Sequence, residues 1–317
     1  MDNCLCITPL QFGAVGDGIA DDTQALQAAV EAAVSRRIKL TSPMSAVYAV
    51  TAPIEVRGSL NADFELAEIR AAAPVPAILR YETPAYYTLV KNLRLDGNLM
   101  ADVCLDIVHA RKMRVDNLIS GRHHKVALRI GQGYEIFVQN THINGATPDD
   151  IKGEAAENTV GIEIATSDCH FSDLVIIDCK TAIANRGFNF YNRIHAWTYK
   201  PEIIKDSVFF DLWERCVISE SYADTFYICF RLRRQGIECK ISGCGSYYNE
   251  QLYLAERGHV TPYLFWIDEG DGRGVAVHSS VMLATNALDG HYANIDKCAV
   301  YTDGSSTFSR WRGAPVH

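Results

Sequence analysis

Three absences narrow the possibilities for this chain of 317 residues. No segment approaches about 18 consecutive apolar residues, so the sequence predicts no membrane-spanning helix. The N-terminus lacks a basic stretch followed by an apolar run, so we expect a soluble product without a standard export signal. Lys and Arg number 30 against 38 Asp and Glu, and no basic stripe occurs. Neither a nucleic acid nor an anionic membrane is therefore the expected main partner.

The ten cysteines form no paired C-x-x-C sets. We therefore expect most of them to be free, buried thiols that behave as small hydrophobic residues. Cys4 with Cys6, and Cys239 with Cys244, leave open a redox or metal role. No matching group of histidines accompanies either pair, so the sequence predicts no metal site and no cofactor.

The middle of the chain contains an internal repeat of short strand-like segments, roughly 20 to 40 residues apart. A second set of such segments precedes several members of the first set, and polar turns separate the two. The first set begins at Val90, Val115, Val138, Phe171, Phe190, Trp213, Ile237, Val275 and Ile295. The second set begins at Leu105, Leu128, Ile162, Phe226 and Leu264.

Repeat units with two short strands and no helix-length apolar period are typical of a parallel β-helix, in which each coil stacks on the next. Leucine-rich repeats have a similar length but need an L-x-x-L-x-L skeleton, which is absent. A β-sandwich is the alternative, because its strands also alternate with turns. We predict an all-β chain that forms a parallel β-helix of about nine or more coils.

The stretch "FGAVGDGIADDTQALQAAVEAA" from residue 12 predicts the capped end that a β-helix needs, because an open coil exposes strand edges and core. Asp21 or Asp22 can cap a helix, and the glycines then serve as turn residues. A dinucleotide-binding loop is the alternative, but the glycine order is G-x-x-G-x-G and no strand–helix alternation follows. The predicted helix has one apolar face: Leu26, Val30, Ala33 and Val34.

This stretch closely resembles the N-terminal signature of the pectate-lyase-like right-handed β-helix superfamily. There, a Phe-Gly-Ala-x-Gly-Asp-Gly turn leads through Asp-Asp-Thr into a capping helix. The resemblance implies a right-handed β-helix with a cap over residues 1–38, coils over 39–303 and a C-terminal tail over 304–317. Proteins that begin this way include polygalacturonase-like hydrolases, lyases, epimerases and phage tailspike depolymerases.

Two specific signatures of the superfamily are incomplete in this chain. Gly258 and His259 lack the second glycine of the polygalacturonase Gly-His-Gly, and "FWIDEG" matches half of the Trp-Ile-Asp-His of calcium pectate lyases. The early capping motif and the aromatic-rich coils look most like a phage or prophage tailspike. That resemblance implies a homotrimer in a virion tail or outside the cell, with phage tail components as partners. It also implies binding and cleavage of a bacterial surface polysaccharide.

Two coils carry insertions, residues 146–159 and 246–261, which the repeat alignment places at one corner. We expect them to project from the same side, about 19 Å apart at about 4.8 Å per coil, and to wall a valley. The turns near 178, at 195–206 and at 219–225 then form the valley floor.

These turns combine carboxylates with aromatic side chains, as glycan cleavage requires. One carboxyl group protonates the leaving oxygen, a second acts as base or nucleophile, and flat rings contact the sugar. Glu220 and Asp224, on one turn, are the first candidate pair, with Glu202 and Asp206 next and Asp178 as a fifth carboxylate. The predicted substrate-binding side chains are His195, Trp197, Tyr199, Tyr222, Tyr247 and Tyr248. The predicted reaction is hydrolysis.

Two other functions stay open. The cluster "GRHHKV", residues 121–126, offers a cation and a base to a lyase acting on a uronic-acid polymer, or it is a charged turn on the solvated surface. A non-catalytic glycan-binding adhesin or tail component would use Trp197 or Tyr199 without the carboxylates. We expect Asp96 and asparagines 92, 117, 140 and 192 to have structural roles in turns and in side-chain ladders.

Overall fold

The computed structural model describes residues 6–145, 159–198, 206–233, 238–248, 263–268, 276–285, 290–293, 299–302 and 311–312. Side chains are described as far as residue 268, except those of 238, 247, 248 and 267. The chain comprises two compact units, Met1–Ala146 (unit 1) and Thr147–His317 (unit 2). The sequence-based division at residues 38 and 303 stays a prediction.

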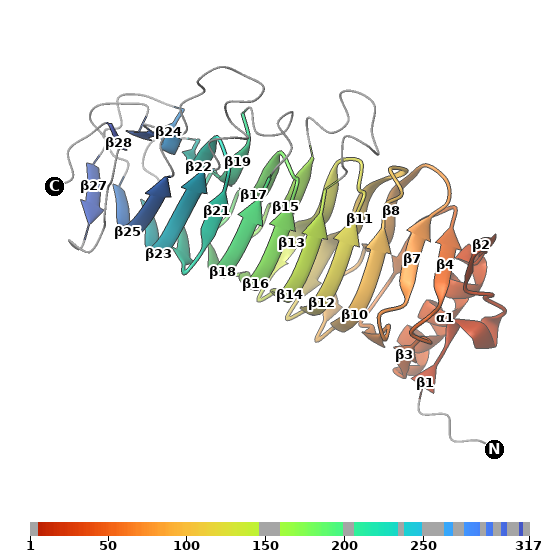
Figure 1. Ribbon diagram of the computed structural model, residues 1–317. Helices are drawn as coiled ribbons and strands as arrows, with labels where there is room; N and C mark the ends of the chain where they lie inside the picture. Colours follow the sequence, from red (N-terminus) through yellow and green to blue (C-terminus); the bar gives the residue numbers. More distant parts are fainter. Residues whose placement is uncertain are drawn as a thin grey trace. The chain divides into compact units, whose positions relative to one another are not determined.

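Unit 1 is a stack of parallel strands that follows a helical cap (Figure 1). In one sheet, β12 (Arg114–Gly121) lies between β10 (Leu89–Asp96) and β14 (Phe137–Asn144). In the other, β11 (Ala101–Arg111) lies between β8 (Val75–Tyr81) and β13 (Val126–Tyr134). The further elements are β1 (Cys6–Ile7), the 3-10 helix η1 (Pro9–Phe12), β2 (Asp17–Asp21), α1 (Thr23–Arg36), β3 (Lys39–Thr41), β4 (Val47–Val50), β5 (Ile54–Val56), β6 (Asn61–Asp63), β7 (Glu68–Ala71) and β9 (Ala85–Tyr86).

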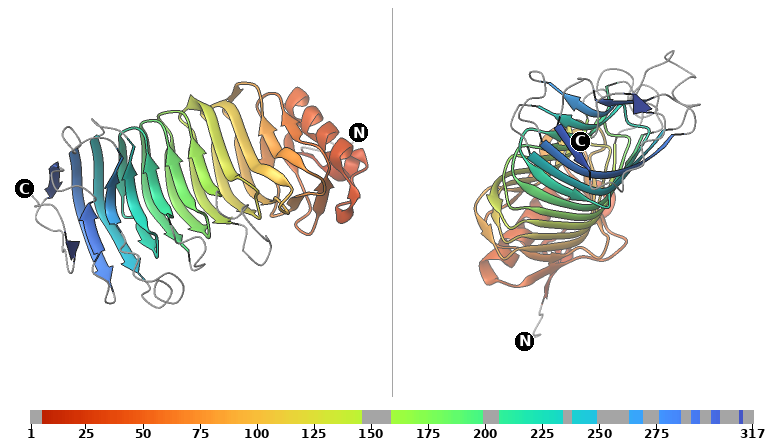
Figure 2. Two further views of the ribbon diagram at one scale, coloured as in Figure 1. Left: turned by 90° about the horizontal axis from the view of Figure 1, so that it is seen from above. Right: turned by 90° about the vertical axis from the view of Figure 1, so that its left-hand side faces the viewer.

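Unit 2 repeats the two-sheet arrangement, and its strands also pair in parallel (Figure 2). One sheet contains β16 (His170–Ile177), β18 (Asn189–Trp197), β20 (Cys216–Ser219), β21 (Tyr222–Asp224), β23 (Glu238–Tyr248), β25 (Ala276–Thr285) and β27 (Ala299–Thr302). The other contains β15 (Val160–Ile164), β17 (Thr181–Asn185), β19 (Val208–Leu212), β22 (Ile228–Leu232), β24 (Tyr263–Ile267), β26 (Gly290–Ala293) and β28 (Trp311–Arg312). This all-parallel pairing within each unit excludes the β-sandwich.

The register between coils confirms part of the predicted repeat. Val90 pairs with Val115, and Val115 with Val138, as expected. In unit 2 the alignment was wrong by one residue, because Phe171 pairs with Tyr191 rather than Phe190. The Phe171 and Tyr191 rings stack in the core with centroids 5.0 Å apart, so the buried ring sets the register.

Two further positions of the predicted repeat are also shifted. Phe190 pairs with Val217 rather than Trp213, which follows β19 and is exposed. Ala276 pairs with Ala299, which moves the last repeat three residues beyond the predicted Ile295.

The glycine-rich stretch is a structural cap. Gly13, Gly16 and Gly18 all have positive φ angles, of 92°, 70° and 77°. Asp22 stands at the helix N-cap, but its carboxylate accepts hydrogen bonds from the turn, from Val15 N at 2.6 Å and Gly16 N at 3.0 Å. The carboxylate therefore ties the turn to the helix, a role that the dinucleotide-loop alternative does not explain.

Helix α1 covers the end of unit 1 with the predicted face. Leu26, Val30 and Ala33 are fully buried, whereas Val34 is half-buried. Gly58, with φ 145°, allows the close approach, because a Cβ there would lie 2.7 Å from Val34 Cγ1. Any larger residue at position 58 would therefore require Val34 of the helix to shift.

Non-glycine residues with positive φ form one corner of the coils. In unit 1 the positive-φ residues at this corner include Asn92, Asn117 and Asn140, and Asn117 Nδ2 donates to Asn92 Oδ1 at 2.8 Å. These three match the predicted turn asparagines. In unit 2 the equivalent corner residues are Asp173, Arg193 and Glu220, so Arg193, not Asn192, takes the corner.

No cysteine in the described residues forms a disulfide, and seven of these eight thiols are buried, as the prediction of buried thiols expects. Cys4 and Cys298 lie outside the described residues. Among the residues that the structure describes, no helix is long and apolar enough to cross a membrane.

Candidate functional site

Four of the predicted site residues meet on the outward face of β18 and β21. Side chains alternate along a strand, so His195 and Trp197 point away from the buried Ile194 and Ala196. Tyr222 and Asp224 likewise flank the buried Ala223. The parallel register places His195 beside Tyr222, and Trp197 beside Asp224. We call these four residues the outer cluster.

The rings of the outer cluster form a compact surface. His195 stacks on Tyr222 with centroids 4.0 Å apart and an interplanar angle of 17°. Trp197 meets His195 edge to face at 4.9 Å. Tyr222 remains 43% exposed, so its ring is available to a ligand. The Trp197 indole N–H is buried and has no hydrogen-bond partner among the described residues.

Asp224 and His195 form a carboxylate–imidazole pair. His195 Nε2 lies 3.3 Å from Asp224 Oδ2, and both side chains are partly exposed. A carboxylate in this position orients the ring, so that Nδ1 is the nitrogen left for exchange with a ligand. Burial, and then the charge of Asp224, raise the pKa of Tyr222. The phenol therefore stays protonated and can donate a hydrogen bond.

Glu220 lies apart from Asp224. It occupies the corner before β21 with φ 51°, whereas Asp224 ends that strand, so the two are not on one turn as expected. A fully extended chain of four residues spans at most about 13 Å between Cα atoms, and the corner at Glu220 shortens this span. Glu220 Oε2 lies 3.4 Å from Asn192 Nδ2 and 3.9 Å from Arg193 Nη1, and its side chain is 65% exposed.

Arg193, a residue that sequence reasoning missed, organises this second group. Its guanidinium contacts Asp173 through Nε at 2.6 Å and Nη2 at 2.8 Å. Hydrogen bonds from Arg193 lower the pKa of Asp173, and the same contacts raise the pKa of Arg193. The signal available in the sequence was the corner position, which the one-residue register error hid.

The remaining carboxylates have different surroundings. Asp178 is buried at a corner with φ 51°, and its Oδ1 accepts a hydrogen bond from Thr198 Oγ1 at 3.3 Å. Asp206 is exposed, and its charge contributes to the raised pKa of Tyr227 after burial and Tyr263. Asp206 lies just before β19, and no described contact joins it to the outer cluster.

Several predicted features lie outside the described residues. These are Tyr199, Glu202 and nearly all of both insertions, so the predicted valley stays a prediction. Tyr247 and Tyr248 lie on β23, where Tyr247 pairs in register with Asp224, but their side chains are not described.

The "GRHHKV" residues are engaged in local contacts within unit 1. Arg122 Nε donates to Asp96 at 2.8 Å, and the pair lies on successive coils. His124 and Lys125 both contact Asp102, at 3.0 and 2.9 Å. His123 is fully buried, and burial lowers its pKa to about 4. These contacts favour the structural interpretation of this turn.

Among the described side chains, no group of three or more His, Cys, Asp or Glu residues could hold a metal ion. The outer cluster itself offers a carboxylate and an imidazole for proton transfer and aromatic rings for stacking.

Comparisons with known proteins relate the chain to solved structures through its fold. No protein-family model matches the chain, and no curated protein matches its sequence. An endo-xylogalacturonan hydrolase from Aspergillus tubingensis aligns over 98% of this chain and 99% of its own, with a TM-score of 0.57 at 10% identity. An alginate lyase from a Paenibacillus species aligns over 84% of this chain and 95% of its own, with a TM-score of 0.61 at 12% identity.

A phage protein shows the same similarity. A tailspike variant of Escherichia coli bacteriophage HK620, solved with a hexasaccharide, aligns over 95% of this chain and 66% of its own, with a TM-score of 0.57 at 8% identity. The chain therefore shares the right-handed parallel β-helix fold of these proteins. At these identities the likeness concerns the fold.

Proposed function

We propose that this protein hydrolyses an extended polysaccharide at the outer cluster of unit 2. The observation that carries the proposal is the stack of Tyr222 on His195 beside the partly exposed Asp224. Exposed rings bind the apolar faces of sugars, and a carboxylate within reach supplies acid–base chemistry. A fold shared with a glycan hydrolase, a lyase and a saccharide-bound tailspike supports the same substrate class.

Glycoside hydrolysis needs a second carboxyl group about 5 to 9.5 Å from the first. Asp206 is the partner that we favour for Asp224, because it is exposed and lies between β18 and β19 in the sequence, as Asp224 lies between β18 and β22. Glu220 is less suitable, since β21 separates it from Asp224 and its neighbours are Asn192 and Arg193. Glu202 belongs to the same turn in sequence and stays a candidate.

A lyase is the second candidate, and the His195–Asp224 pair is the observation that favours it. An imidazole oriented by a carboxylate is a suitable base for the proton next to a uronic-acid carboxyl group. A lyase would leave unsaturated products, whereas a hydrolase adds one water for each bond cleaved.

We further propose that the protein acts outside the cell or in a virion tail as a homotrimer, with tail components as partners. The fold shared with the tailspike supports this assignment. Light scattering on the purified protein should give three times the mass of one chain. A monomer would contradict the trimer and leave the hydrolysis proposal unaffected.

The decisive experiment is a panel of neutral and acidic bacterial polysaccharides incubated with the protein, with new reducing ends and product masses recorded together. We expect shortened chains that have gained water. Unsaturated products would contradict the proposed hydrolysis and show that the protein is a lyase. Binding without any cleavage would overturn both and favour a glycan-binding adhesin or tail component.

A further inference from the structure

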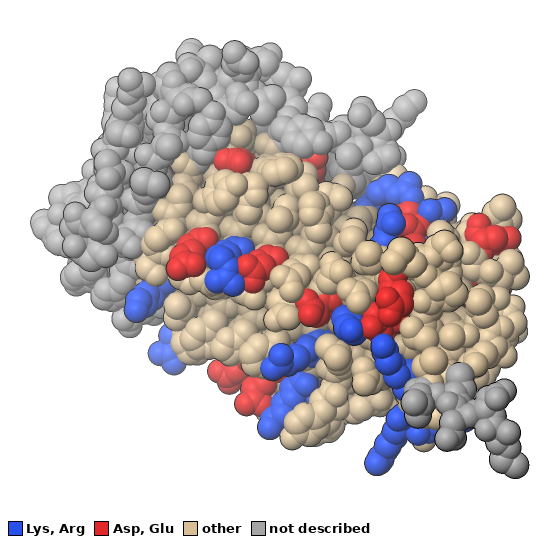
Figure 3. Space-filling view, turned by 60° about the horizontal axis from the view of Figure 1, so that its bottom comes forward, with Lys and Arg blue, Asp and Glu red and all other residues tan. Residues whose placement is uncertain are grey.

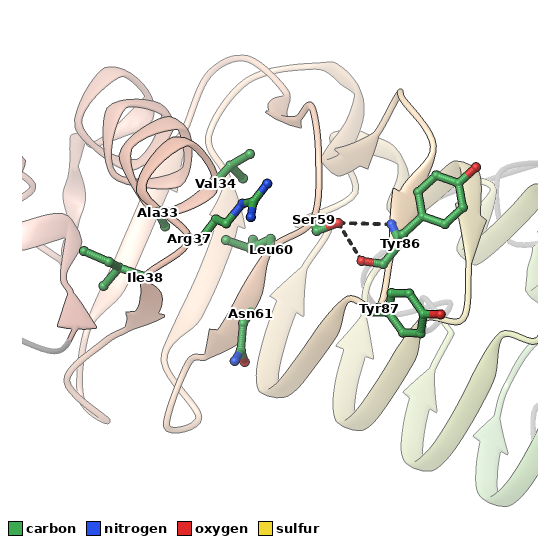
Figure 4. Close-up of a pocket in the computed structure, with 9 residues that line it drawn as sticks. All are labelled: Ala33, Val34, Arg37, Ile38, Ser59, Leu60, Asn61, Tyr86 and Tyr87. Carbon is green, nitrogen blue, oxygen red and sulfur yellow. Dashed lines mark hydrogen bonds between the residues drawn. The ribbon is translucent and has the colours of Figure 1, made fainter.

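A pocket in unit 1 opens beside the last turn of α1 (Figure 4). Its cavity is about 510 Å³, and Arg37 lies on the helix side while Asn61, Tyr86 and Tyr87 lie on the coil side. Ser59 fixes the coil side: Tyr86 N donates to Ser59 Oγ at 3.1 Å, and this hydroxyl donates to Tyr86 O at 2.5 Å. The tyrosines remain 43% and 76% exposed.

The pocket continues into a row of side chains on successive coils. In register, Tyr86 pairs with Arg111, and Arg111 pairs with Tyr134. The Arg111 guanidinium lies 5.6 Å from the Tyr86 ring centre and 5.0 Å from that of Tyr134. Arg111 Nη1 also donates to the Tyr86 hydroxyl at 3.0 Å. A guanidinium held between rings is a preorganised anion-binding group. We call the pocket and this row the tyrosine corner.

Positive charge accumulates at the tyrosine corner. The described part of unit 1 contains ten arginines, and six of them form ion pairs with carboxylates. The described residues provide no ion pair for the other four arginines, which are Arg36, Arg37, Arg111 and Arg114. Three of these lie at this corner: Arg37 lines the pocket, and Arg111 and Arg114 flank the corner of the coil next to Tyr86 and Tyr87. Arg111 pairs in register with Tyr86, and Arg114 N donates a hydrogen bond to the carbonyl of Thr88. Lys112 Nζ lies 5.4 Å from the Tyr87 ring centre and pairs with Glu135 at 3.6 Å.

We propose that the tyrosine corner binds a saccharide chain that carries carboxylates, such as a hexuronate polymer. The exposed rings bind sugar faces, and Arg37 and Arg111 bind the carboxylates. A nucleic acid is disfavoured, because the net charge is −8 and acidic side chains interleave with basic ones on the visible face (Figure 3). The site lies within unit 1 and does not depend on hydrolysis at the outer cluster.

The test is calorimetric titration of the full chain, carrying Asp224→Asn so that the probe is not cleaved. The probes are hexagalacturonate and its fully methyl-esterified form, which has the same rings without the charges. We expect the acid to bind, with an affinity that falls as salt is added, and the ester to bind at least about tenfold more weakly. Arg37→Gln and Arg111→Gln should each weaken binding of the acid about tenfold.

Arg57→Gln is the matched control, because Arg57 is exposed in the same unit and pairs with Glu55 at 3.6 Å. It should bind the acid like its parent, and all variants should melt at similar temperatures. No binding of either probe, equal affinity for acid and ester, or equal losses in all three variants would overturn the proposal. Equally tight binding of a single-stranded oligonucleotide would overturn it too. Hexuronate binding without polysaccharide cleavage would reject only the proposed function.

Discussion

Two aspartates differ in the side chains that lie beside them on neighbouring strands. Each lies on the middle one of three paired strands. In unit 1, Asp106 on β11 lies in register between Arg80 and Arg129. In unit 2, Asp224 on β21 lies in register between Trp197 and Tyr247. Neighbouring strands are about 4.8 Å apart, so residues in register are one another's closest partners. The same backbone geometry thus gives one carboxylate two cations and the other two aromatic positions.

The consequences for the two carboxylates are opposite. The Asp106 side chain is 2% exposed and accepts hydrogen bonds from Arg129 at 2.9 and 2.6 Å. Asp224 is 28% exposed, and among the described residues its close partner is His195 rather than a lysine or arginine. A carboxylate that neighbouring cations neutralise serves stability, whereas one bordered by rings stays available to a ligand.

The largest expected effect comes from removing the available carboxylate. Asp224→Asn keeps the shape of the side chain but abolishes its acid–base capacity, so cleavage should fall by about 10²- to 10⁴-fold. Asp206→Asn should act similarly if it is the partner. Reducing-end assays at saturating substrate measure both. Full activity of Asp224→Asn would refute the outer cluster as the active site.

Glu220→Gln is the control for that experiment. Because Glu220 lies at the other end of β21, its loss should change the rate by less than about fivefold. A loss as large as that of Asp224→Asn would restore the pair expected from sequence.

The second largest effect is a loss of stability when the carboxylate of Asp106 is removed. Asp106→Asn leaves Arg80 and Arg129 without their shared counter-charge, so the free energy of unfolding should fall by about 2 kcal/mol. Denaturant unfolding measures this change. Asp102→Asn is the matched control, since the Asp102 side chain is 37% exposed and its loss should cost less than about 1 kcal/mol. Equal losses in the two variants would contradict the role of burial.

The fold could be predicted from the sequence because its signals are local and repeated. Turn asparagines at 92, 117 and 140 recur with the coil period, and the glycine–aspartate stretch marks the cap. In unit 2 the corner asparagine that marks the repeat is absent. Arg193 and Glu220 adopt there the positive φ that asparagines adopt in unit 1. A corner that tolerates several residue types leaves no reliable signal in a single sequence.

The outer cluster was within reach of sequence reasoning, whereas the tyrosine corner was not. His195, Trp197, Tyr222 and Asp224 belong to neighbouring turns with an evident mixture of rings and carboxylates. Arg37, Tyr86 and Arg111 each look like isolated surface residues in the sequence. Arg37 and Tyr86 line one pocket, and Tyr86 contacts Arg111, because the coil lengths bring these positions together. To predict this from the sequence requires the register of every intervening strand.

The smallest expected effect is a pH dependence at a second neutralised carboxylate of unit 1, Asp63. Burial alone would raise the pKa of Asp63, but hydrogen bonds from Lys91, Asn92 and Lys39 outweigh burial and hold it well below its usual range. The stabilisation is therefore complete above the unfolded pKa of about 3.9 and is lost as the pH falls further toward the folded value. Asp63→Asn should lower the melting temperature at pH 7, and the gap to the wild type should narrow as the pH falls below about 4. Asp224→Asn removes a carboxylate for which the described residues provide no lysine or arginine partner, so this variant should follow the wild type throughout. A gap for Asp63→Asn that stays constant with pH would mean that packing, rather than paired charge, makes Asp63 stabilising.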